Sequence, residues 1–243
     1  MADLDGHCIQ VFDETGKFVR KLGSPGHMDG QFDEPVDVTF FNDDEILVTD
    51  ECNHRIQQLN VQTGNFVKSF GKKGSGDGEF KNPASVCITS DGRFIVVTDY
   101  VNNRIQVFTM DGEPVFKFGD SGPERLNNPS SCVCYEEKFI VTDLKNNCVK
   151  VFDGKGQFLY KFGGKGNGEG QMDIPCCSCV DKYGNLLVCD SRNGRIQQFS
   201  LEGNFTGKTS TKVNLTVPWG VTTMPDDRIL ITEHHGKEVK ILK

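Results

Sequence analysis

Hydrophobic and polar positions alternate in short runs along this chain, and each run ends at a turn rich in glycine, asparagine or aspartate. The region that begins at Pro35 sets the pattern, because four β-rich runs follow it with polar turns between them. Runs of this length and composition predict short antiparallel strands, which we name a to d. The four runs are residues 36–41, a run that ends at Thr49, residues 55–61 and residues 66–70.

The same series recurs along the chain. The segment "ILVTDECNHRIQQL" at Ile46 returns as "FIVVTDYVNNRIQVF", "FIVTDLKNNCVKVF" and "LLVCDSRNGRIQQF", with a weaker copy, "ILITEHHGKEVKIL", at Ile229. A period of 43 to 48 residues is typical of four-stranded propeller blades, which bury their faces only by stacking on their neighbours. A proline opens each repeat, at Pro35, Pro83, Pro129, Pro175 and Pro218.

The two ends decide how many blades are expected. Residues 3–23 match the end of a b strand followed by c and d, whereas residues 218–243 supply only a, b and c. We therefore predict one all-β domain over residues 1–243, a six-bladed propeller that lacks part of its N-terminal blade. The alternative is a closed ring of five blades, in which residues 18–22 serve as the d strand beside residues 239–242.

Composition and charge narrow the function. No apolar run approaches the roughly 18 residues of a membrane span, and no basic segment followed by an apolar one opens the chain, so we expect a cytoplasmic protein without a membrane partner. The ten cysteines are then expected to be reduced core residues. A net charge of −7 disfavours broad attraction to phosphate and leaves only a local basic patch possible.

The repeated motifs resemble NHL repeats. The resemblance rests on "VTD" or "VCD", on "NNRIQVF" or "NGRIQQF", on a closing "FG", and on connections such as residues 77–80 and 168–172. These connections look most like the NHL domains of tripartite-motif proteins. That resemblance implies a recognition propeller, with ubiquitin-ligase activity in a RING module that this chain does not contain.

An acidic residue ends every complete b strand, which could suggest a ring of metal ligands. The spacing Asp-x-x-Asn instead favours carboxylates that accept backbone N–H groups and shape the turn, so we expect no metal here. The acidic residues are Asp50, Asp99, Asp143, Asp190 and Glu233.

The cysteines on the a strands are a second candidate metal site. Cys132 and Cys134 lie three and five residues after their proline, whereas Cys177 and Cys179 lie two and four residues after theirs. The two pairs should therefore point to opposite strand faces, and there is no Cys-x-x-Cys pair. We expect no zinc and no other cofactor.

Catalytic signatures are equally weak. The five histidines do not share one position of the repeat, and neither a Gly-x-Ser-x-Gly nor a His-x-x-x-His motif is present. A metal-dependent lyase of NHL type remains an alternative, but we expect no enzyme, no catalytic residue and no small-molecule substrate.

Binding is the function that remains. Strand order places the d-to-a connections and b-to-c turns on one face, here called the loop face, where recognition is expected. The net charge of the d-to-a connections is −2, so the face is not uniformly basic. It has a basic sector around Lys165, Arg192, Arg195, Lys208 and Lys212, and an acidic sector at Asp29, Asp33, Glu34, Asp50 and Glu51. Such asymmetry suits a protein partner at least as well as single-stranded RNA. The candidate contacts are Lys165, Arg192, Arg195, Lys208, Lys212, His54, Arg55, Lys72, Lys73, Arg104 and Trp219, with Phe32 and Phe80 as further aromatic anchors.

Overall fold

The computed structural model describes residues 1–208, 215–224, 226–234 and 239–242. The described chain is all-β, with no α-helix and only two short 3₁₀ turns, and it divides into two compact units, Met1–Arg125 and Leu126–Lys243. No helix among the described residues is long and apolar enough to cross a membrane. The prediction of a single domain over residues 1–243 stays a prediction.

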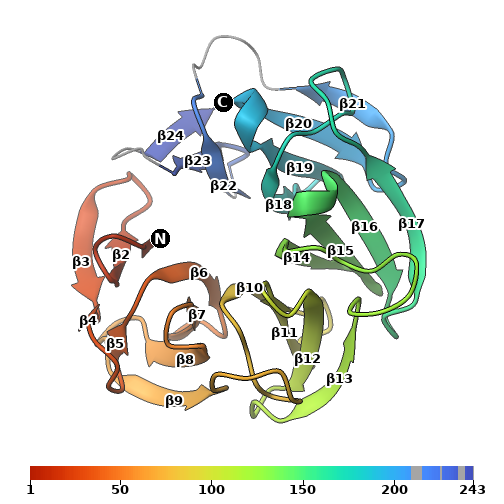
Figure 1. The fold of residues 1–243 in the computed structure, drawn as a ribbon. Coiled ribbons are helices and arrows are strands. Elements are labelled where there is room, and N and C mark those ends of the chain that lie inside the picture. The colour runs from red at the N-terminus through yellow and green to blue at the C-terminus, as the bar shows by residue number, and fades with distance from the viewer. Residues whose placement is uncertain (209–214, 225, 235–238, 243) are drawn as a thin grey trace. The chain divides into compact units, whose positions relative to one another are not determined.

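Unit 1 contains two four-stranded antiparallel sheets, β6-β7-β8-β9 and β10-β11-β12-β13, after a three-stranded sheet, β1-β2-β3 (Figure 1). A short parallel pair, β4-β5, lies in the first d-to-a connection. The strands are β1 Ala2–Asp3, β2 Cys8–Phe12, β3 Phe18–Leu22, β4 Ser24–Pro25, β5 Gln31–Phe32, β6 Pro35–Phe40, β7 Glu45–Asp50, β8 Arg55–Asn60, β9 Phe66–Phe70, β10 Pro83–Ile88, β11 Phe94–Asp99, β12 Arg104–Thr109 and β13 Pro114–Phe118.

Unit 2 has two further four-stranded sheets, β14-β15-β16-β17 and β18-β19-β20-β21, and ends in the three-stranded sheet β22-β23-β24. Its elements are β14 Pro129–Tyr135, β15 Lys138–Asp143, η1 Leu144–Asn146, β16 Cys148–Asp153, β17 Phe158–Gly163, β18 Pro175–Val180, β19 Asn185–Asp190, η2 Ser191–Asn193, β20 Arg195–Ser200, β21 Phe205–Lys208, β22 Pro218–Thr223, β23 Ile229–Glu233 and β24 Val239–Leu242.

Each predicted strand lies within a residue or two of its expected bounds, because period-2 patterning and turn residues act locally. Both ends also follow the prediction. β1 is the end of a b strand and pairs with β2, while the last sheet contains a, b and c strands. β2 is thus the central strand of its own sheet, whereas the five-bladed alternative requires it to be redundant.

The core lies between neighbouring sheets of each unit. In unit 1 the a strands β6 and β10 pack side by side, as do β14, β18 and β22 in unit 2 (Figure 1). Within each unit, every neighbouring pair of blade sheets buries one apolar cluster, such as Leu47, Ile56, Phe80 and Phe108 between the second and third blades. Burying a large apolar side chain stabilises by roughly 1.5 to 3 kcal/mol, so stacking supplies what a lone blade lacks.

The d-to-a connections contribute to this core. Phe32 and Phe80, expected as exposed anchors, are wholly buried, and the Phe80 ring centroid lies 5.5 Å from that of Phe108. Gly71 permits this packing, because a Cβ at its φ of +94° would lie 2.4 Å from the Phe80 ring. The expectation that these two phenylalanines contact a partner is wrong, because each fills the interface between sheets.

Candidate functional site

The b-to-c turns of the loop face are organised around a buried carboxylate. Asp99 is fully buried and receives the Lys81 backbone N–H at 2.8 Å, the Asn102 amide at 2.8 Å and Arg104 Nε at 2.7 Å. The Arg104 guanidinium then donates to three carbonyls of the d-to-a connection, those of Ser75, Gly76 and Glu79. Turn and connection are therefore joined into one rigid unit.

Two other repeats build the same network. Asp50 receives the Asp33 N–H at 2.8 Å and Arg55 Nε at 2.7 Å. Asp190 receives the Asp173 N–H at 2.8 Å and Arg195 Nε at 2.7 Å. The structural reading of the Asp-x-x-Asn motif is confirmed, since these oxygens are occupied by N–H donors.

The repeat that begins at Pro129 uses a variant. Cys148 stands where the repeats of Asp50, Asp99 and Asp190 have arginine, and Lys150, two residues later, places its Nζ 3.0 Å from Asp143 Oδ2. Lys150 is 4% exposed and Asp143 is fully buried. A cation thus compensates the buried carboxylate from a different strand position.

These networks correct part of the sequence-based site. Arg104 is 3% exposed at its side chain, Arg55 13% and Arg195 15%, and all three bind the protein's own carboxylates and carbonyls. Asp50, assigned to the acidic sector, is likewise buried. The sequence identified the charges but not their partners, and the networks make these four residues structural.

The second residue after each buried aspartate forms the apex of its turn. In four repeats the apex backbone N–H donates to the d-to-a connection at 3.1 Å, while the side chain changes from repeat to repeat. Arg192 is such an apex, and its side chain is 63% exposed. The four apexes are Cys52, Val101, Lys145 and Arg192.

Lys145 is the residue that sequence reasoning missed. It is exposed and occupies the same repeat position as Arg192, so alignment of the turns would have identified it. Lys165 is also exposed and lies near Arg192, since the carbonyl of Gly166 accepts from the amide of Asn193 at 2.8 Å. Among the described residues, three exposed cations thus lie on the loop face of unit 2.

The other predicted contacts are distributed more widely. Lys72 and Lys73 are exposed in unit 1, and Lys72 lies 3.5 Å from Glu79. Trp219 is half-buried, packed edge-on against His234 with ring centroids 4.6 Å apart. Lys212 lies outside the described residues, and the side chain of Lys208 is outside them too.

His54 links two repeats. Its φ is +57°, and its Nδ1 accepts the backbone N–H of Asn82 at 3.2 Å. In the same way, His7 Nδ1 accepts the backbone N–H of Glu34, and Asn147 Oδ1 accepts that of Ile174. Burial, and secondarily Lys73, lowers the pKa of His54, which keeps Nδ1 available as an acceptor.

Two of the histidines occupy one position of the repeat, contrary to the sequence-based expectation. His7 and His54 both precede the first residue of a c strand, so two of the five histidines do share a repeat position. Their shared role is to accept a backbone N–H, as Asn147 does elsewhere. This position therefore serves the fold.

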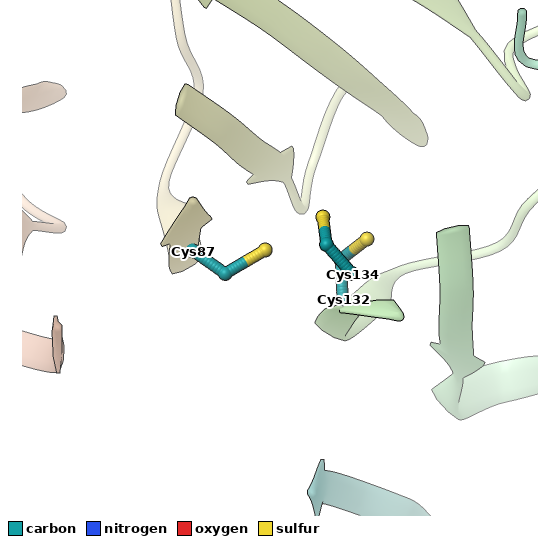
Figure 2. A group of neighbouring side chains, drawn as sticks. All are labelled: Cys87, Cys132 and Cys134. Carbon is teal, nitrogen blue, oxygen red and sulfur yellow. The ribbon is translucent and has the colours of Figure 1, made fainter. Parts of the chain in front are cut away.

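All ten cysteines carry thiols. Cys132 and Cys134 project from the same side of β14, and Cys87 belongs to β10 (Figure 2). The register of β18 places Ser178 where Cys132 stands in β14, so Cys177 and Cys179 face the other way, toward the cluster that includes Val221. The predicted opposition of the two cysteine pairs is confirmed.

Burial suppresses ionisation of several thiols. Burial, opposed by a hydrogen bond from Ser191, raises the pKa of Cys176 to about 12. Cys52 also has a pKa raised to about 12, by burial and by the Glu34 carboxylate, which lies 3.2 Å from its Sγ. Neutral thiols are poor nucleophiles and poor metal ligands, so these cysteines serve packing.

Comparisons with known families support this architecture. NHL repeats match at residues 32–59 and 80–108, and a family described as a six-bladed β-propeller, DUF5128, matches at residues 125–228. Among curated proteins, the chain is similar to protein lin-41 of Caenorhabditis elegans, at 41% identity over 44 residues. That match spans 18% of this chain and 4% of lin-41.

Solved structures show the same fold at low identity. Virginiamycin B lyase from Staphylococcus aureus is 17% identical with a TM-score of 0.65, over 86% of this chain and 69% of that one. A streptogramin B lyase is 15% identical with a TM-score of 0.69, over 99% and 74%. A chain of a nidogen/laminin complex is 18% identical with a TM-score of 0.68, over 86% and 76%.

The matched families agree with the six antiparallel sheets of three or four strands that the described residues form, apart from the short β4-β5 pair. They favour the six-bladed prediction over the closed ring of five. The sheet topology agrees, because β2 is the central strand of a separate sheet, β1-β2-β3. The chain carries NHL repeats and a six-bladed β-propeller domain of small antiparallel sheets.

Proposed function

We propose that the chain is a recognition module that binds a polypeptide or single-stranded RNA through its loop face. One observation carries the proposal. The apex backbone is fixed by the same 3.1 Å hydrogen bond in four repeats, whereas its side chain is cysteine, valine, lysine or arginine. Variable side chains on a rigid frame are the arrangement that recognition loops use.

The loop face of unit 2 is the part proposed to contact the partner. Lys145, Lys165 and Arg192 are exposed there, and the nearby Arg195 is held inside by Asp190. Ser191 donates to the carbonyl of Pro218, which brings the Arg192 turn next to the strand of Trp219. Cations beside an aromatic ring suit an acidic peptide or a phosphate backbone with stacked bases.

The relatives support a binding role without naming the partner. The nidogen/laminin neighbour is a protein complex, and the short match to lin-41 agrees with the resemblance to tripartite-motif NHL domains. We propose further that a longer parent protein carries a RING module, for which this propeller selects the target. The chain itself is then not an enzyme.

Crosslinking with a charge-reversed pair tests the site. A pull-down from cell extract, scored for both RNA and protein, should recover a partner with the wild-type chain. The amount of partner recovered should fall at least about tenfold with Lys145→Glu/Arg192→Glu. The matched control, Lys155→Glu/Lys161→Glu, reverses two exposed cations of the same unit away from these turns and should keep binding. Equal loss in both pairs, or in neither, contradicts the proposed site.

Salt dependence separates the two partner classes. For RNA, the slope of log affinity against log salt is steep, and it should fall by about 0.7 for each phosphate contact removed. For a polypeptide the slope is shallow, and the Trp219→Ala variant should weaken binding more than it changes the slope.

A metal-dependent lyase is the alternative. The likeness to the two lyases is below 25% identity and shows the fold alone. Elemental analysis of the purified chain tests it, because a stoichiometric metal would support the lyase and would count against a purely binding role.

A further inference from the structure

A cavity of about 330 Å³ lies in unit 2 between the β18-β19 and β22-β23 hairpins. These a-to-b hairpins emerge at the opposite strand ends from the b-to-c turns, so the cavity does not belong to the loop face. Leu187, Met224 and Ile229 supply its apolar wall, and Leu187 is only 5% exposed. Tyr183 and Asp227 stand at its rim.

Tyr183 is not required by the hairpin that carries it. Tyr183 is 70% exposed. The hairpin is already shaped by Asp181, whose Oδ1 accepts the backbone N–H groups of Tyr183 and Asn185. The equivalent turn positions in two other repeats are Asp43 and Asp91, since Gly92 stands where this hairpin has Gly184. An exposed aromatic ring beside an apolar cavity is a feature of binding surfaces.

The rim already holds a cation. Lys182 Nζ lies 2.7 Å from Asp227 Oδ2 and 5.2 Å from the centroid of the Tyr183 ring, while the Tyr183 hydroxyl donates to Asp227 Oδ2 at 3.1 Å. This pairing holds the pKa of Asp227 below its ordinary value and raises that of Lys182. The carboxylate is thus ionised, and ring and carboxylate together accept an ammonium group.

We propose that this cavity is a second recognition site, which takes an arginine side chain of a partner polypeptide. The guanidinium plane stacks on Tyr183 and donates two N–H groups to Asp227. The ammonium group of a lysine can neither stack in this way nor form such a two-pronged hydrogen bond. The aliphatic stem lies along Met224 and Ile229. In the chain with no polypeptide bound, Lys182 occupies the position of the cation. Its side chain is 53% exposed and swings into solvent when the arginine enters.

Charge supports a basic occupant over an acidic one. Asp181 and Asp227 line the cavity, against the single cation Lys182, so the lining has an excess of one negative charge. When Lys182 leaves, Asp227 meets the incoming group directly, while the Asp181 oxygens stay bonded within their own hairpin and add negative charge nearby. The chemistry therefore distinguishes this site from the cationic apexes of the loop face.

Methyl NMR of the whole chain tests the proposal. The probe is acetyl-Gly-Arg-Leu-Gly-amide, and the reference peptide carries citrulline, which has nearly the same shape without the charge. We expect saturable shifts of the Met224 and Ile229 methyl signals with the arginine peptide, and affinity weaker by about fivefold with the citrulline peptide. Absence of shifts, or equal affinity for both peptides, overturns the proposal.

Three variants sharpen the result. Lys182→Ala removes the internal competitor and should raise affinity about threefold, whereas a merely structural role predicts a loss. Tyr183→Ala should lower affinity about fivefold, and Asp227→Asn, which tolerates the φ of +68°, should abolish discrimination between the two peptides. The control is Arg93→Ala, which removes a comparable hairpin cation, paired with Asp91 and 5.6 Å from the Phe94 ring, and should change nothing.

Binding to the loop face is a separate matter. Lys145→Glu/Arg192→Glu should leave the arginine-peptide shifts unchanged, so failure of either site is visible independently. If the Lys145→Glu/Arg192→Glu variant binds both peptides more tightly, binding follows the overall charge of the chain. That result would contradict the proposal that the cavity recognises arginine.

Discussion

The loop faces of the two units have the same interior and different apexes. Unit 1 holds its turns with Asp50 and Asp99, and unit 2 with Asp143 and Asp190, all four buried. At the apexes, unit 1 presents Cys52 and Val101, whereas unit 2 presents Lys145 and Arg192. The frame is thus repeated while the apex side chains change from neutral to basic.

This difference shows how the chain separates stability from recognition. A buried charge whose partner is removed costs several kcal/mol, while an exposed charge contributes at most about 1 kcal/mol. Substitutions at the apex therefore alter the surface without disturbing the neighbouring network of buried aspartate, N–H donors and cation. The counts of charge along the sequence located the basic sector around Lys165 and Arg192, but they also included Arg195, which the structure pairs with Asp190.

The largest expected effect is on the frame of unit 1. Arg104→Ala leaves the Asp99 carboxylate buried without its cation and should lower the free energy of unfolding by about 3 to 5 kcal/mol. Urea denaturation followed by circular dichroism measures it. Arg192→Ala, at an exposed position, should change stability by no more than about 0.5 kcal/mol, and equal losses would refute the distinction between frame and apex.

The variant frame of unit 2 should be nearly as sensitive. Lys150→Ala removes the cation of Asp143 but leaves the Asn127 N–H and the Asn146 amide on that carboxylate, so we expect a loss of about 3 kcal/mol. Trp219, the only tryptophan, reports unfolding of unit 2 by fluorescence. Lys155→Ala, at an exposed site of the same unit, is the control, and a loss there of similar size would contradict the prediction.

Exchanging the apexes gives a smaller, functional effect. In the Arg192→Val/Val101→Arg variant, the network is untouched, so stability should stay within about 0.5 kcal/mol of wild type. Partner affinity should fall by about tenfold if recognition resides in unit 2. The measurement is the crosslinking assay with a titration of the recovered partner, and unchanged affinity would mean that apex charge does not carry recognition.

The smallest effect is a pH dependence confined to unit 1. Because the pKa of His54 is lowered in the folded state, the bond from the Asn82 N–H contributes fully above the unfolded pKa and is lost as pH falls through the folded pKa. The groups that face His54 are Lys73, Asp99, Asp50 and Glu51.

Hydrogen exchange at the Asn82 amide measures this effect. Protection should decrease as pH falls below about 6.5, after correction for intrinsic exchange. His54→Asn should remove the dependence, since Asn147 makes the equivalent bond in unit 2 without titrating in this range. Persistence of the pH response in His54→Asn would assign it to another group.

Strand positions could be predicted closely because they depend on local patterning. Site residues could not, as Arg195 and Arg192 illustrate. Both are arginines in one turn, yet Arg195 reaches Asp190 and three carbonyls while Arg192 is exposed. Their difference comes from a connection some 25 residues away along the chain, whose carbonyls at residues 167, 168 and 171 accept the Arg195 guanidinium.

The sequence by itself determined the repeat, its four strands and the role of the acidic residue that closes each b strand, and it favoured six blades while leaving a closed ring of five open. These follow from alternation and from turn chemistry, which act over a few residues. Only the tertiary structure decided which charges are buried, that Phe32 and Phe80 are core, and that Tyr183 stands beside a cavity. Burial and pairing depend on segments that meet only after folding, so they are properties of packing and not of local sequence.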